Sequence, residues 1–110
     1  MRRELLTDLE LMILLAVLRL GDNAYGVTIT RELEDTAGRS VAIALVYATL
    51  DRLQDRGLVL SWKGDPTPER GGRAKRFFEV TAKGIRQIKH TQRAFTALWT
   101  GIPQLKDRTI

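Results

Sequence analysis

The stretch KGDPTPERGGRA, residues 63–74, is the feature that most constrains the fold. Its prolines lack a donor N–H and its glycines weaken a strand interior, so no strand or helix can run through it. The β-prone runs LVLSW (58–62) and RFFEV (76–80) lie on either side. This pattern predicts one antiparallel hairpin with a long, basic tip.

The rest of the chain has apolar residues at helical spacing. Thr7 and Glu10 form a capping-box pattern at the start of the first helix, and Gly21 ends it. Ser40 is the expected N-cap of a third helix, and Thr81 that of a last one. The expected helices are therefore those that start at Thr7, cover 27–37, cover 41–56, and run from Thr81 towards Gly101 and Pro103.

The order helix, helix, helix, strand, basic loop, strand, long helix is that of a winged helix-turn-helix followed by a helix free to pair. The predicted fold class is mainly α with a small β-hairpin wing (α+β). We expect one compact unit, with the winged helix-turn-helix over residues 1–80 and a C-terminal dimerisation helix and tail over 81–110.

Two helices carry more apolar surface than a chain of 110 residues can cover by itself. The first is apolar nearly all round, and the last has a heptad stripe interrupted by Gln92. A homodimer that buries both surfaces is the prediction. The interface candidates are Leu11, Leu15, Leu18, Ile85, Ile88, Phe95, Trp99 and Ile102.

Composition narrows the function. With 18 Lys and Arg against 13 Asp and Glu, the net charge is +5, which favours an anionic partner. There is no cysteine and one histidine, His90, so we expect no metal site and no cofactor. No nucleotide-binding or nucleophile motif is present, and we expect no enzymatic activity. The apolar run at 11–18 is shorter than the ~20 residues of a membrane span. We expect no membrane association, no export signal and a cytoplasmic protein.

Three motifs point to a family. They are Tyr25-Gly26, VYATLDRLQDRGLV from Val46 to Val59, and RFFEVTAKG from Arg76 to Gly84. Together, over roughly residues 6–88, the chain resembles the PadR family of bacterial transcriptional regulators, in its small subclass with a short C-terminal helix. The resemblance implies a homodimer that binds double-stranded DNA at a pseudo-palindromic operator and usually represses transcription, often under control of a small-molecule inducer. It also implies a recognition helix at 41–56 and a basic wing at 64–76.

The DNA-contact candidates are mostly cations on the wing and on the third helix, which would neutralise phosphates. They are Arg39, Ser40, Tyr47, Arg52, Lys63, Arg70, Arg73, Lys75 and Arg76. The wing cations taken alone favour a solvated, flexible hairpin tip; the order of elements around them favours DNA. For Tyr47, a packed aromatic ring with a wet hydroxyl is the alternative.

Two further points stay open. The family usually has Ser or another small polar residue and a Gly where this chain has Ala42, Ala44 and Leu45. Such an apolar helix start also suits a winged-helix protein-interaction module without sequence-specific DNA binding; a basic surface that binds RNA or membranes by charge alone is a third option. The resemblance also makes Phe95 and Trp99 candidate ligand contacts, with plain interface packing as the alternative.

Overall fold

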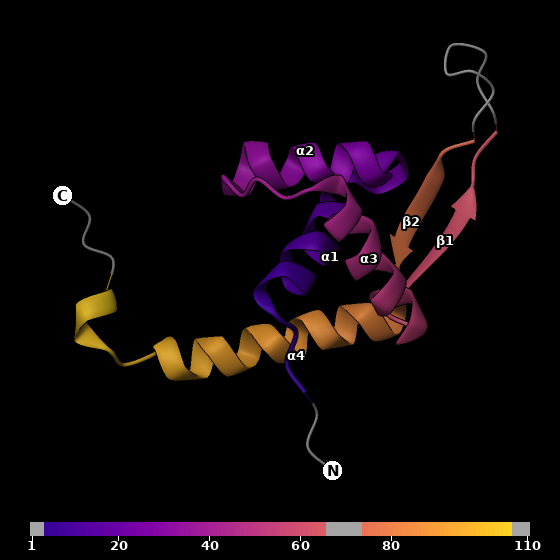
Figure 1. Cartoon of the computed structure of the whole chain (residues 1–110). Coiled ribbons are helices and arrows are strands. Elements are labelled where there is room, and N and C mark those ends of the chain that lie inside the picture. Colours follow the sequence, from indigo (N-terminus) through magenta and orange to yellow (C-terminus); the bar gives the residue numbers. More distant parts are fainter. Residues whose placement is uncertain (1–3, 66–73, 107–110) are drawn as a thin grey trace.

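A computed structural model describes residues 4–65 and 74–106 of the chain. In these two stretches the protein is mostly helical, with one two-stranded antiparallel sheet, as the sequence predicts (Figure 1). The elements in chain order are α1 (Asp8–Leu20), η1 (Gly21–Asn23), α2 (Gly26–Ala37), α3 (Ile43–Asp55), β1 (Val59–Lys63), β2 (Arg76–Val80), α4 (Ala82–Trp99) and η3 (Pro103–Leu105).

Helix α1 is the centre of the fold, in contact with α2, α3, β2 and α4. Its start is confirmed as a capping box: the Thr7 hydroxyl accepts from the Glu10 N–H at 3.2 Å, and the Glu10 carboxylate accepts from the Thr7 N–H at 2.8 Å. The fully buried side chains of α1 meet apolar side chains of α2, α3 and the two strands. The core residues include Ile13, Leu14, Val17, Ile29, Leu33, Val46, Leu50, Leu53, Val59 and Phe78.

The Tyr25-Gly26 pair joins α2 to the sheet. The Phe78 N–H donates to the Ala24 carbonyl at 2.9 Å, and Tyr25 forms a β-bridge with Phe77. The Tyr47 ring of α3 lies so close to Gly26 that a Cβ at this position would overlap it. A glycine at the start of α2 is therefore what allows α3 to pack closely.

Helix α3 starts two residues later than predicted. It begins at Ile43, its N-cap is Ala42, and no side chain caps it, so the prediction of Ser40 as N-cap is wrong. The residues before α3 form the C-terminal cap of α2, because Gly38 adopts φ +67° and the Arg39 N–H donates to the Leu33 carbonyl at 3.0 Å. The chain leaves that cap extended, and Ser40 lies exposed outside both helices.

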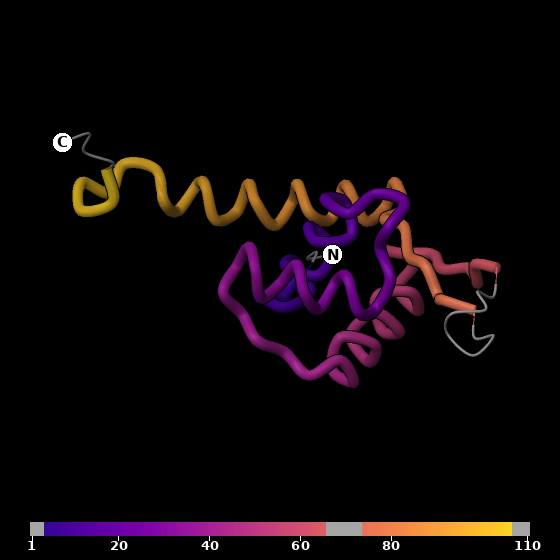
Figure 2. The backbone as a smooth tube through the Cα atoms, turned by 90° about the horizontal axis from the view of Figure 1, so that it is seen from above, coloured from indigo at the N-terminus to yellow at the C-terminus, as the bar shows by residue number. Residues whose placement is uncertain are grey.

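Helix α4 starts as predicted, with the Thr81 hydroxyl accepting from the Gly84 N–H at 3.0 Å. It ends at Trp99, since Gly101 has φ +85°. Ile102, which the heptad pattern placed on the helix, therefore lies beyond its end. The heptad spacing includes Ile102 in the sequence, but the backbone leaves the helix before that residue. The C-terminal end of α4 extends past the other helices (Figures 1 and 2).

The face of α4 that packs on the core is polar, which the heptad pattern did not indicate. Gln87 is 8% exposed and Thr91 is fully buried. The Gln87 side-chain amide donates to the Glu4 carbonyl, and the Thr91 hydroxyl accepts from the Leu6 N–H at 3.1 Å. Because both groups satisfy the backbone that precedes α1, their burial leaves no hydrogen bond unmade.

Candidate nucleic-acid interface

The hairpin stands beside α3 as a wing (Figure 1). Strands β1 and β2 pair in register from Val59 opposite Val80 to Lys63 opposite Arg76. Phe78 faces the core at 1% exposed, while Trp62 stacks on Phe77 on the other face, with ring centroids 6.1 Å apart. Period-2 alternation along β2 thus attaches the wing to the helices. The two candidate DNA contacts at the tip, Arg70 and Arg73, lie outside the described residues.

Arg76 is engaged with α3. Its guanidinium donates to Asp51 at 2.8 Å and to the Gln54 side-chain oxygen at 3.0 Å, and its Nε donates to the Ser61 hydroxyl at 3.2 Å. Its guanidinium carbon also lies 4.8 Å from the Phe78 ring centroid. We call these contacts the Arg76 clip. They fasten β2 to α3 and compete with the phosphate contact that the sequence led us to expect.

The other described wing cations are placed differently. The Lys75 Nζ lies 4.5 Å from the Tyr25 ring centroid, a cation–π contact that orients the side chain without neutralising its charge. Lys63, at the end of β1, is exposed. The register places Lys63 on the same face of the hairpin as Arg76, and Lys75 on the opposite face, so the two charges flank the wing.

Tyr47 and Arg52 lie on successive turns of α3. Tyr47 is half-buried, as expected for the edge of the core, with its ring against Gly26 and 6.5 Å from the Phe78 centroid. Arg52 is exposed, and its guanidinium donates to the Thr49 hydroxyl at 3.3 Å. Thr49, which receives that bond, is 1% exposed and donates to the Leu45 carbonyl at 2.8 Å.

Arg39 is directed towards α1. It forms an ion pair with Asp8 at 3.0 Å and contacts the Met12 sulfur at 3.8 Å. The pair ties the loop between α2 and α3 to the start of α1. The contacts of Arg39 are therefore with α1, whereas two of the described wing cations contact α3 or Tyr25. Ser40, the next residue, is exposed.

The outward face of the first half of α3 is apolar. Ile43 is 42% exposed and Leu45 is 45% exposed, and Ala44 and Ala48 are also exposed. The first turn of α3 ends at Val46, which is fully buried, so this turn is covered on one side only.

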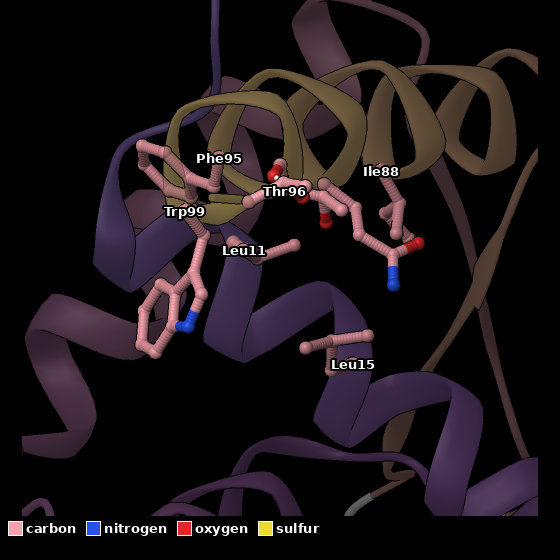
Figure 3. A pocket seen from close by; sticks show the side chains of 8 residues that line it. Leu11, Leu15, Ile88, Phe95, Thr96 and Trp99 are labelled. Atoms are coloured by element: carbon pink, nitrogen blue, oxygen red, sulfur yellow. Dashed lines mark hydrogen bonds between the residues drawn. The ribbon is translucent and has the colours of Figure 1, made fainter. Parts of the chain in front are cut away.

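A second apolar surface lies between α1 and α4 (Figure 3). Leu11 and Leu15 point from α1 towards Ile88, Phe95 and Trp99 of α4, around a hollow of about 420 Å³. Phe95 is 52% exposed and Trp99 is 61% exposed. Gln92, the polar break in the heptad stripe, lines the same hollow. Leu18, Ile85 and Ile102 do not line it.

The sequence did not single out Leu98, which is 75% exposed and lines an adjoining apolar hollow with Trp99 and Leu105. It lies off the heptad stripe, so the only available signal was its place next to Trp99. No group of metal-ligating side chains occurs within residues 4–65 and 74–106. In the same stretches, no helix combines the length and apolar character needed to span a membrane.

The comparisons with known proteins agree with this architecture. A PadR-like transcriptional regulator from Bacillus cereus is 20% identical, with coverage of 92% of this chain and 93% of that chain and a TM-score of 0.70. A PadR family regulator from Eggerthella lenta is 21% identical, covers 90% and 83%, and has a TM-score of 0.67. A transcriptional regulator from Clostridium thermocellum is 19% identical, covers 89% of each chain, and has a TM-score of 0.70.

These three likenesses support the winged-helix fold. No curated protein sequence matches the chain. The family itself is established by sequence, because the pattern of the "Transcriptional regulator PadR-like family" matches residues 14–90, well over half of the 110 residues. The chain belongs to the PadR-like family of transcriptional regulators.

Proposed function

We propose that this regulator is a homodimeric repressor that binds a pseudo-palindromic DNA operator in the cytoplasm, with α3 in the major groove and the wing on the flanking phosphates. The observation that carries the proposal is the free outward face of α3 beside a wing that bears Lys63 and Lys75. A helix of this size fits the major groove of B-DNA, and cations at its border neutralise the backbone.

The dimer follows from the surface between α1 and α4. Leu15, Phe95 and Trp99 are each more than 40% exposed and surround one apolar hollow. A contiguous apolar surface of this kind marks an interaction site. To place both α3 helices in successive major grooves, the second copy that covers it has to set them about one DNA turn, ~34 Å, apart.

The hollow between α1 and α4 is also where we place the inducer. Phe95 and Trp99 offer aromatic faces, and Gln92 offers an amide, which suits a flat, mostly apolar molecule. A ligand that binds there better when the α3 helices have the wrong spacing would release the DNA.

The test of DNA binding is a fluorescence-anisotropy titration with the DNA upstream of the protein's own gene, against scrambled DNA of equal length, at several salt concentrations. We expect sequence-preferring binding that weakens with salt. Replacing Arg70 and Arg73 with Ala should lower the slope of log K against log salt by about 0.9 for each phosphate that the variant no longer neutralises. The matched control replaces Lys89 and Arg93, exposed cations of α4, and should leave the slope unchanged.

The dimer is tested by sedimentation equilibrium. Leu15→Glu should shift the protein towards monomer, because a charge on the α1 surface would have to be desolvated in the interface. Leu60→Glu is the matched control, since Leu60 lies on the wing strand β1 and is 44% exposed against 41% for Leu15. Equal effects of the two substitutions would contradict the proposed interface.

A protein-interaction module is the second candidate function, and the apolar start of α3 favours it. Ile43 and Leu45 could enter an apolar groove of a protein partner. That function predicts equal, weak binding to the upstream and scrambled DNA in the titration. It also predicts that replacing Arg70 and Arg73 changes the salt dependence of DNA binding no more than replacing Lys89 and Arg93 does.

A further inference from the structure

The exposed side chains in the first half of α3 are apolar, whereas a recognition helix usually reads bases with polar ones. We propose, on the basis of the DNA-binding function above, that α3 reads the C5-methyl groups of thymines in A·T-rich half-sites by apolar contact. The contact residues are Ile43, Ala44, Leu45 and Ala48.

The geometry suits a groove. Ala44 and Ala48 are one turn apart and therefore line one face of the helix, with Leu45 beside them. Methyl side chains along that line let the helix backbone approach the floor of a groove closely. The larger side chains of Ile43 and Leu45, each more than 40% exposed, extend on the two sides.

The Thr49 hydroxyl is already engaged, because it donates to the Leu45 carbonyl at 2.8 Å. The half-buried Tyr47 ring is packed against Gly26, which fixes its place at the edge of this face. The helix start has no side-chain cap, so no capping hydroxyl or carboxylate occupies it either. Apart from the Tyr47 hydroxyl, the first two turns of α3 therefore offer methyl and methylene groups where other helices offer hydrogen bonds.

The major groove has one apolar group, the thymine C5-methyl. An apolar side chain over a G·C pair would cover the guanine O6 and N7 and the cytosine N4 without replacing their hydrogen bonds to water, which is unfavourable. Against thymine, the same side chain buries a methyl group, which is favourable. The apolar face of α3 thus favours A·T over G·C pairs for two reasons: the lost hydrogen bonds at G·C and the buried methyl group at thymine.

Charge favours DNA over a protein partner as the occupant. Arg52 lies one turn beyond Ala48 on the same face and is exposed. The negative charge of Asp51, next to it, is met by Arg76 at 2.8 Å. An apolar strip that continues into the cation Arg52, with the adjacent Asp51 carboxylate paired to Arg76, matches a groove floor bordered by phosphates.

The experiment starts from the operator that the wild-type protein prefers in a selection from randomised DNA. Each thymine is then replaced singly by deoxyuridine, which lacks only the C5-methyl group. We expect two or more thymines per half-site at which affinity falls about fourfold, equivalent to about 0.8 kcal/mol for one methyl group.

A variant links the effect to the helix. In Leu45→Ala, whose side chain is exposed and not needed for the core, at least one deoxyuridine penalty should disappear. In the control variant Leu60→Ala, on the wing, all of the deoxyuridine penalties should persist. Preferred binding without any deoxyuridine penalty would overturn the methyl-reading inference and leave DNA binding intact. Selection of no preferred sequence would overturn the proposed function itself.

Discussion

The Arg76 clip leads to a prediction that separates a structural role from a DNA contact. Replacing Arg76 with Ala removes the contacts to Asp51, Gln54 and Ser61. The ion pair is partly solvated, with 33% of the Arg76 side chain and 56% of the Asp51 side chain exposed, so it contributes at most about 1 kcal/mol. The remaining hydrogen bonds and the ring contact add an amount of the same order.

We therefore expect Arg76→Ala to lower the free energy of unfolding by about 1.5 kcal/mol, which corresponds to a fall of roughly 6 °C in Tm for a domain of this size. Thermal denaturation at fixed protein concentration, followed by circular dichroism, measures it. A double-mutant cycle with Asp51→Ala should give a coupling energy of about 0.5–1 kcal/mol, because the two side chains touch.

The DNA measurement completes the test. The double variant, Asp51→Ala with Arg76→Ala, leaves the net charge of the protein unchanged. If Arg76 serves only to fasten the wing to α3, the slope of log K against log salt stays at the wild-type value. A slope lower by about 0.9, together with no coupling to Asp51, would show that Arg76 contacts a phosphate and would refute the structural role.

Two further predictions concern stability and protonation. Gly84→Ala should lower the free energy of unfolding by about 1–3 kcal/mol in a chemical-denaturation experiment. The reason is that the alanine Cβ would meet the backbone carbonyl of Leu58, which cannot move aside. The control is Arg86→Ala, on the same helix but away from that contact, which should change the free energy of unfolding by less than about 0.5 kcal/mol. The Thr36 hydroxyl is the main cause of the lowered pKa of Glu32, so this carboxylate stabilises the fold above its usual pKa, and that contribution is lost as pH falls through the lowered value. Thr36→Ala should raise the pKa of Glu32 in an NMR titration; an unchanged pKa would contradict this cause.

Some site properties follow from tertiary contacts that no local pattern contains. Gln87 and Thr91 look like the polar side of a surface helix, yet they are buried because the backbone at Glu4 and Leu6 meets them from more than 80 residues away in sequence. In the sequence, Arg76 looks like one more wing cation, but the packing of the hairpin on α3 brings it to Asp51. Pairings of this kind depend on how elements pack, and periodicity describes one element at a time.

Local signals in the sequence set where most elements begin and end, because they act within a few residues. The Gly- and Pro-rich stretch at 63–74 separates the two strands, Thr7 and Glu10 cap α1, and Thr81 caps α4. Which apolar side chains stay exposed depends instead on how the elements pack. Ile43 and Phe95 have the same hydrophobic character as the core residues, but the described elements leave 42% and 52% of them exposed. Burial depends on what lies opposite a side chain, and that is a property of the packed fold.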